Sequence, residues 1–176
     1  MPDSRQPLQG RTHVTRTRVR FGETDAAGIV FYPTFFAWFD VGMSGLLRAA
    51  LGGELSDAHG RPRFPVPIVE TGARFVAPLH FDDAIAIRST ITELGTSSMR
   101  IEHIVLRGDV EAARGFEVRV LVRAGDDGRI VAAPLPPQLR AALAEPDARA
   151  RDVRASVQRL ARIRQAGRIR SRPGGP

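Results

Sequence analysis

The longest apolar stretch of the chain runs from Pro33 to Leu51 and is apolar on nearly every side. A helix of this length spans about 28 Å, and a helix that is apolar all round is typical of a buried position. Proline is favoured at the first helical position, and the glycine pair Gly52-Gly53 is a typical stop signal. The pattern therefore predicts one long helix over 33–51, buried inside its domain.

Most of the remaining apolar residues follow the period of two that is typical of β-strands. We expect one strand over 12–21, before the helix, and further strands at about 66–77, 84–94, 99–107, 116–124 and 129–133. In the strand over 116–124, Phe116, Val118 and Val120 alternate with positions expected to be polar or exposed. This order of elements predicts an α+β fold class, with an antiparallel sheet wrapped around the one long helix.

Shorter patterns complete the C-terminal part of this domain. Asp126-Asp127-Gly128 is typical of a hairpin turn, so the last two strands should pair. Residues 136–144 predict a short helix, and the polar stretch over 54–65, which contains glycine and proline, predicts a loop.

The composition excludes several kinds of chemistry. A chain of 176 residues fits one domain with a sizeable core. It has no cysteine, which excludes disulfides, thiolate catalysis and metal sites with cysteine ligands. All 26 basic residues are arginines, so Schiff-base chemistry and a lysine-dependent phosphate loop are excluded as well. The four histidines are scattered without ligand spacing, so no metal site is expected.

The positive charge is concentrated at the C-terminal end. Residues 1–145 hold 17 arginines and 17 acidic residues, whereas 146–176 hold 9 arginines and 2 aspartates. We therefore predict a disordered N-terminus over 1–10, a single domain over 11–145 and an Arg-rich tail over 146–176, partly helical or disordered. The tail is either a solvated appendage or a contact for an anionic partner. With no signal-peptide pattern and no membrane-length apolar run, we expect a soluble, cytoplasmic protein with no transmembrane segment.

The stretch from Phe21 to Pro33 contains the chemistry that stands out. Asp25 precedes a glycine-containing turn, and Pro33 begins the long helix. The first N–H groups of a helix carry partial positive charge, which suits a developing oxyanion. A carboxylate beside such a site is suited to attack on an activated carbonyl, although Asp25 can instead simply cap the turn. Glu23 is interpreted as a solvated charge at the end of the first strand.

The sequence Asp25-Ala-Ala-Gly-Ile-Val-Phe-Tyr32-Pro33, followed by a buried helix, resembles the hot-dog-fold thioesterases. It is most similar to the Asp-dependent 4-hydroxybenzoyl-CoA thioesterase family. The similarity continues through Pro67-Ile68-Val69, Ala73-Arg74-Phe75-Val76 and Phe81-Asp82-Asp83 to about Leu106, and it covers roughly 15–145. The resemblance implies a hot-dog fold and hydrolysis of an acyl-CoA thioester to a free acid and coenzyme A. It implies no separate cofactor, since coenzyme A is part of the substrate.

The resemblance also implies roles for individual residues. Asp25 corresponds to the catalytic carboxylate, and the backbone N–H of Tyr32 corresponds to the group that polarises the thioester carbonyl. Asp25 can act as a nucleophile or as a general base, and the sequence leaves both open. Gly28 and Val30 belong to the same motif as substrate-binding positions. Family members form homodimers or homotetramers, with a continuous sheet across the dimer and active sites at its interface.

The sequence departs from the family pattern at two substrate-binding positions. The turn Gly95-Thr96-Ser97-Ser98 lacks the basic cluster that holds the CoA phosphates in the hydroxybenzoyl-specific members, so we assign that contact to Ser98 or Arg100. Val66 stands in place of a pocket threonine. Asp40, inside the apolar helix, requires a partner: either an arginine across an interface or a polar group of the acyl chain. The acyl group thus stays open between an aryl group, such as 4-hydroxybenzoyl, and a short acyl chain.

Two other classes of protein compete with a thioesterase on the same fold. A hydratase or dehydratase pairs a histidine with its carboxylate, and no histidine accompanies Asp25. A non-catalytic protein that binds acyl-CoA, or that interacts with a partner through its tail, is the main alternative.

Overall fold

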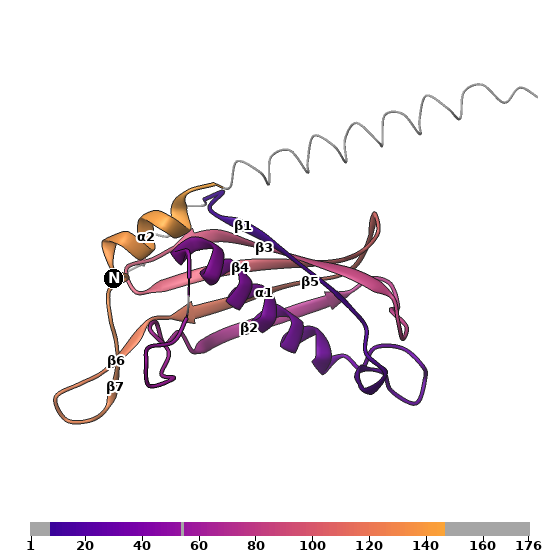
Figure 1. Ribbon diagram of the computed structural model, residues 1–176, viewed down its shortest axis with the longest axis horizontal. Coiled ribbons are helices and arrows are strands. Elements are labelled where there is room, and N and C mark those ends of the chain that lie inside the picture. Colours follow the sequence, from indigo (N-terminus) through magenta and orange to yellow (C-terminus); the bar gives the residue numbers. More distant parts are fainter. Residues whose placement is uncertain (1–7, 54, 147–176) are drawn as a thin grey trace, which may run out of the picture. The chain divides into compact units, whose positions relative to one another are not determined.

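Five strands form one antiparallel sheet in the computed structural model, which describes residues 8–53 and 55–146. The strands are β1 (Thr12–Arg18), β2 (Ile68–Phe75), β3 (Ala84–Leu94), β4 (Ser98–Arg107) and β5 (Val110–Val120). Their order across the sheet is β1-β3-β4-β5-β2, so β1 and β2 are the two edges (Figure 1). The sequence predicted strands close to the positions of β1, β2, β3 and β4, whereas its prediction for β5 differs from the structure.

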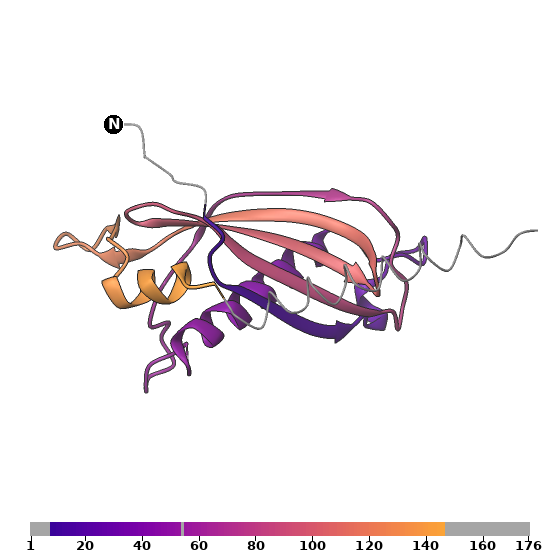
Figure 2. The same ribbon diagram turned by 90° about the horizontal axis from the view of Figure 1, so that it is seen from above.

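The helix α1 (Pro33–Leu51) lies across one face of this sheet, and the sheet curves around it (Figures 1 and 2). Its bounds are those that the apolar pattern predicted. Gly52 ends it in a left-handed conformation, with a φ of 66°, and donates its N–H to the carbonyl of Arg48 at 3.0 Å. The predicted arrangement of an antiparallel sheet around one buried helix is confirmed.

Two glycines bring α1 unusually close to the sheet. A Cβ at Gly42, on the helix, would collide with Oγ of Ser89 on β3. A Cβ at Gly115, on β5, would collide with the ring of Phe39 on the helix. Any larger residue at either position would therefore push the helix away from the sheet.

The core consists of two clusters along α1. The cluster near the start of the helix contains Val19, Val30, Phe35, Trp38, Phe39, Leu79, Ile85, Ile87, Val105, Ala112 and Ala113. The cluster near its end contains Met43, Leu46, Leu47, Ile91, Met99, Ile101, Leu121, Ala133, Leu135, Leu139 and Leu143. The last two residues belong to the short helix α2 (Pro137–Ala144), which was predicted over 136–144 and closes this end of the core.

The strand predicted over 116–124 is two strands in the structure. β5 begins at Val110, after a turn at Gly108 with a φ of 58°, and β6 (Val122–Ala124) pairs separately with β7 (Ile130–Ala132). The predicted hairpin at Asp126-Asp127-Gly128 joins β6 to β7 and is confirmed.

Two positions between the apolar residues of this strand are polar, as the alternating pattern predicted, but buried. Glu117 and Arg119 are only 1% and 7% exposed. Both lie on β5 opposite buried residues of β4, Ile101 and Met99. An ion pair between the two side chains makes this burial tolerable.

The ends of the domain differ in part from the expectation. Residues 8–10 were predicted to be disordered, but Leu8 and Gly10 donate backbone hydrogen bonds to Thr92 (2.7 Å) and Ile91 (3.0 Å) on β3. Residues 1–7 and the predicted Arg-rich tail beyond Pro146 lie outside the described residues. No helix among the described residues is long and apolar enough to cross a membrane.

Candidate active site

Asp25 begins a tight turn that leads into α1. Its N–H donates to the carbonyl of Ile29, and the N–H of Gly28 donates back to the Asp25 carbonyl, both at 2.9 Å. Gly28 has a φ of 75°, which glycine adopts without strain. The carboxylate oxygen Oδ1 accepts the N–H of Ala27 at 2.8 Å, so Asp25 does cap the turn. The side chain is exposed, and its other oxygen accepts no hydrogen bond within the described residues, which leaves that oxygen for chemistry.

Tyr32 stands at the start of α1, directly before Pro33. The N–H groups on either side are used, because Phe31 donates to Glu23 (2.9 Å) and Thr34 donates to the carbonyl of Phe31 (2.9 Å). The N–H of Tyr32 has no acceptor among the described residues, and the residue is 59% exposed. A free N–H at a helix start is suited to hold an oxyanion.

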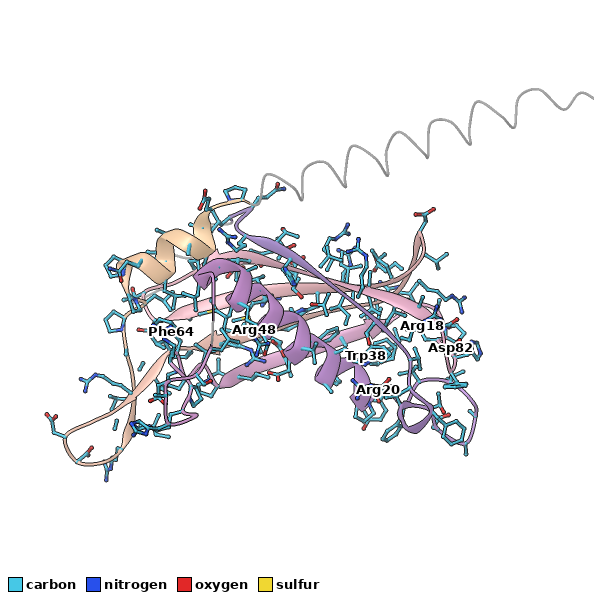
Figure 3. All side chains as sticks on the ribbon, in the orientation of Figure 1. Arg18, Arg20, Trp38, Arg48, Phe64 and Asp82 are labelled. Carbon is cyan, nitrogen blue, oxygen red and sulfur yellow. The ribbon has the colours of Figure 1, made fainter. Side chains whose placement is uncertain are left out.

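Glu23 holds this segment against the helix. Its Oε2 accepts the backbone N–H of Arg20 at 2.7 Å, and its Oε1 accepts the indole N–H of Trp38 at 3.2 Å. Figure 3 shows Trp38 on α1 and Arg20 on the neighbouring segment. Only 19% of the Glu23 side chain is exposed, so the interpretation as a solvated charge was wrong: Glu23 is a structural brace.

A second brace comes from the turn before β3. The N–H of Val30 donates to the carbonyl of Leu79 at 2.8 Å, and Ile29 forms a β-bridge with His80. Asp83 closes that turn by accepting the backbone N–H of His80 and a guanidinium N–H of Arg107, each at 2.8 Å. These two hydrogen bonds, the first more than the second, lower the pKa of Asp83. The loop that contains Asp25 is thus fixed from two sides.

Asp40 and Val66 are brought together by a residue that the sequence did not single out. Arg119 donates from Nη2 to Oδ1 of Asp40 (2.7 Å), from Nη1 to the carbonyl of Val66 (3.2 Å) and from Nε to Glu117 (2.9 Å). The predicted arginine partner of Asp40 therefore exists, but it comes from the same chain and not from across an interface. The Asp40 side chain remains 62% exposed, whereas Arg119 is 9% exposed.

A line of buried polar groups continues from Arg119 into the core. Glu117 faces Nε2 of His103 at 3.5 Å, and Nδ1 of His103 is 2.8 Å from Oγ of Ser89. The imidazole stacks on the ring of Phe39, with the ring centroids 4.8 Å apart. Ser89, His103 and Glu117 resemble a hydrolytic triad in composition, but none is more than 1% exposed, so no substrate reaches them. This line is part of the core.

The charges in this line reinforce each other. Burial acts to raise the pKa of Glu117, but the nearby His103 and the hydrogen bond from Arg119 outweigh it and lower that pKa. Burial likewise acts to lower the pKa of Arg119, and its contacts with Glu117 and Asp40 reverse the direction. Oε1 of Glu117 and Nε2 of His103 have no hydrogen-bond partner in the described part of the chain.

Ser98 and Arg100 lie far from Asp25 within one chain. The Asp25 loop meets the start of β3 through the turn at Leu79, whereas Ser98 and Arg100 lie on β4 beside the end of β3. The 11 residues of β3 separate these ends by roughly 35 Å. The guanidinium of Arg100 stacks over the ring of Phe116 at 3.9 Å. The predicted site residues of one chain therefore fall into two separate groups, which we call candidate half-sites. Asp25, Gly28 and Tyr32 lie in one, beside the buried side chain of Val30, and Ser98 and Arg100 lie in the other.

Comparison with known proteins identifies the family of this chain. The sequence profile described as the thioesterase superfamily matches residues 27–113. The 4-hydroxybenzoyl-CoA thioesterase of Pseudomonas sp. (strain CBS-3) is 30% identical over 132 residues, which are 72% of this chain and 93% of that protein. This chain belongs to the thioesterase superfamily.

Two further thioesterase relatives extend the comparison. The 1,4-dihydroxy-2-naphthoyl-CoA hydrolase of Synechococcus sp. (strain CC9311) is 30% identical over 142 residues, 77% of this chain and 90% of that protein. The solved structure of a gentisyl-coenzyme A thioesterase is 36% identical, with a TM-score of 0.66 over 74% of this chain and 98% of its own. The predictions of a thioesterase and of a hot-dog fold are confirmed.

The matched segment does not include every residue of the candidate site. It contains Tyr32, Asp40 and Arg100, but it begins two residues after Asp25 and ends before Arg119. The role of Asp25 rests on its turn geometry and on the resemblance of its motif, and that of Arg119 on its contacts alone. The signal that could have pointed to Arg119 was weak: Glu117 and Arg119 alternate with the apolar residues of the last part of β5.

Proposed function

We propose that this thioesterase hydrolyses an acyl-CoA whose acyl group is aromatic and hydroxylated, releasing the free acid and coenzyme A. The observation that carries the proposal is the pairing of a free carboxylate oxygen on Asp25 with an unused N–H on Tyr32 in one fixed loop. The proposal requires that, when a carbonyl oxygen binds this N–H, the thioester carbon lies within the reach of the carboxylate or of a water beside it.

The reaction follows from these two groups. As the carbonyl carbon becomes tetrahedral, its oxygen gains negative charge, and the Tyr32 N–H stabilises that charge by about 3 kcal/mol. Asp25 either attacks the carbon, forming an anhydride that water then hydrolyses, or takes a proton from the attacking water. The C–S bond breaks, and the sulfur leaves as the thiolate of coenzyme A. Both routes yield a carboxylic acid and free thiol.

The surface beside the loop suits an aromatic group with a polar substituent. Asp40 lies about two helical turns after Tyr32 on α1. The exposed helix residues near it, Ala37 and Val41, are apolar, and Val66 lies on its other side through Arg119. An apolar strip that ends in a carboxylate favours a ring carrying a hydroxyl group. The named substrates of the three relatives are all hydroxylated aromatic acyl groups, which supports the same choice.

We further propose that two copies complete each site. β2 is an edge strand whose outer side has no partner among the described residues, and Ile68, Val69 and Phe75 on it are 44%, 62% and 47% exposed. Pairing of β2 with the β2 of a second copy would cover these side chains and join the separated half-sites. The expected mass in light scattering is two or four times 19.2 kDa. A 19.2 kDa monomer that turns over substrate would contradict this arrangement.

We also propose that this hydrolysis takes place in the cytoplasm. A cysteine-free chain is compatible with that compartment. Whether the Arg-rich tail binds an anionic partner stays a prediction.

The test is thiol release from 4-hydroxybenzoyl-, benzoyl-, phenylacetyl-, short aliphatic and long aliphatic CoA thioesters. We expect turnover of the hydroxylated aromatic substrate, and a loss of about 10²-fold or more in Asp25→Asn. Asp57→Asn is a matched control, because Asp57 caps a turn in the same way, accepting the N–H of His59 at 2.8 Å. Its activity should be that of the unmodified protein.

Two outcomes would contradict the proposal in different ways. Near-normal turnover by Asp25→Asn would remove this carboxylate from the mechanism. A folded protein that binds acyl-CoA but releases no thiol from any of these substrates would be the non-catalytic acyl-CoA-binding protein instead.

A further inference from the structure

The three donor groups of Arg119 reach three different parts of the fold. Nη2 binds Asp40 on α1, Nη1 binds the Val66 carbonyl in the loop before β2, and Nε binds Glu117 on β5 itself. Only a guanidinium places three N–H directions in one rigid plane, so lysine could not satisfy these acceptors together. Arg119 therefore fixes the position of the helix residue, the loop and the strand relative to each other.

Behind Arg119, the buried line prevents the guanidinium from turning. Glu117 is 1% exposed and holds Nε at 2.9 Å, and His103 and Ser89 lie behind Glu117 in the core. Each of these groups is buried between α1 and the sheet, where the absence of a side chain at Gly42 leaves room for Ser89. The orientation of Arg119 is thus set from inside the core.

In front of Arg119, the exposed Asp40 carboxylate uses only one of its two oxygens as a hydrogen-bond acceptor within the described residues. Oδ1 accepts the Arg119 N–H at 2.7 Å, and Oδ2 accepts no hydrogen bond within the described residues. A carboxylate held by one oxygen leaves the other in a fixed position, ready to accept an O–H from a ligand. Arg119 itself is 9% exposed, and each of its three side-chain nitrogens already donates a hydrogen bond, so it acts through Asp40.

We propose that Arg119 is a positioning residue that sets the acyl-group specificity of the enzyme by fixing Asp40 to accept a hydroxyl hydrogen bond. The buried line from Ser89 through Glu117 supports this positioning from behind. The proposal rests on the function proposed above and deepens it. In this proposal, Arg119 does not touch the substrate. It nevertheless determines how well the enzyme distinguishes a hydroxylated ring from the same ring without the hydroxyl.

The experiment compares kcat/KM for 4-hydroxybenzoyl-CoA and benzoyl-CoA, which differ by one hydroxyl. The unmodified protein should prefer the hydroxylated substrate by about tenfold or more, as expected for one hydrogen bond to a charged group. Arg119→Lys keeps a positive charge beside Glu117 but loses the planar guanidinium that reaches all three acceptors. We expect it to lose most of this preference, mainly through a higher KM for 4-hydroxybenzoyl-CoA, with turnover of benzoyl-CoA within about threefold of the unmodified protein.

A second variant and a control separate positioning from a general structural effect. Asp40→Asn should lose the same preference, and the double variant Asp40→Asn/Arg119→Lys should lose no more than either alone, because the two residues act as one unit. Arg114→Lys alters an arginine on the same strand that pairs with Glu111 at 2.9 Å, and it should leave the preference unchanged. Circular dichroism and the melting temperature of each variant check its fold.

Each other result would overturn the proposal. An Arg119→Lys variant that keeps the preference, or that loses turnover of both substrates equally, would show that Arg119 has only a structural role. An unmodified protein that hydrolyses both substrates equally well would refute this inference and leave the proposed hydrolysis standing. Absence of turnover on every thioester would refute both.

Discussion

Strand β5 holds two glutamate–arginine pairs that face opposite sides of the sheet. Glu111 and Arg114 form two hydrogen bonds, at 3.1 and 2.9 Å, with 32% and 53% of their side chains exposed. Glu117 and Arg119 form one at 2.9 Å, with 1% and 9% exposed. The same two residue types thus meet at the same distance in water and in the core.

The contrast between the two pairs shows that hydrogen-bond distance does not determine how much an ion pair contributes to stability. Water solvates either member of the Glu111–Arg114 pair when the other is lost, so the pair is worth little. The core cannot solvate Glu117 or Arg119, so both depend on their few neighbours to remain charged: each other, His103 beside Glu117 and Asp40 beside Arg119. Only the buried pair can transmit an orientation, because water cannot replace a lost partner there.

The largest effect should follow from removing the buried cation. Arg119→Met leaves the buried Glu117 carboxylate without the closer of its two stabilising neighbours, which we expect to lower the free energy of unfolding by about 3–5 kcal/mol. Chemical denaturation of the variant beside the unmodified protein measures this loss. The double variant Glu117→Met/Arg119→Met should recover most of it, since no buried charge remains. A single variant as stable as the unmodified protein would mean that water enters this part of the core.

Acid should reveal a smaller effect of the same origin. The pKa of Glu117 is lowered in the folded protein relative to its ordinary value of 4.5. Its ionised form therefore stabilises the fold fully above pH 4.5, and this contribution is lost as the pH falls through the lowered pKa. The unfolding free energies of the unmodified protein and Glu117→Gln should converge as the pH falls below 4.5 and through the lowered pKa, as the direction of the shift requires. A difference that stays constant over this range would contradict the lowered pKa.

The smallest effect should come from the exposed pair. The pKa of Glu111 is also lowered, mainly by its hydrogen bond with Arg114, but solvent screens the pair. Arg114→Met should therefore cost less than about 1 kcal/mol of unfolding free energy, and less still in 1 M salt. A loss as large as that of Arg119→Met would remove the distinction between the two pairs.

The local parts of this fold could be predicted because local rules determine them. The bounds of α1 follow from Pro33 at its start and Gly52 after its end, and the hairpin at Asp126-Asp127-Gly128 follows from turn chemistry. The start of β5 was missed because Gly108 forms a tight turn without a proline or a second glycine.

The contact between Asp40 and Arg119 in the candidate site could not be predicted in the same way. Asp25 and Tyr32 lie seven residues apart, so one motif reveals both. Asp40 and Arg119 are 79 residues apart and meet only because β5 lies under α1 in the folded sheet. A charged residue in a strand is usually solvated, so a sequence pattern assigns Arg119 to the surface unless the partner is already known.

The two glycines between helix and sheet have a consequence for how such an enzyme can diversify. Gly42 and Gly115 admit no other side chain without displacing α1, so substitution at these two positions would disturb the packing of the helix on the sheet. The outward positions near Asp40, such as Ala37 and Val41, carry no such restriction. Proteins descended from this chain would therefore change their substrate through substitutions on the outward face of α1, while the residues packed beneath that face stay the same.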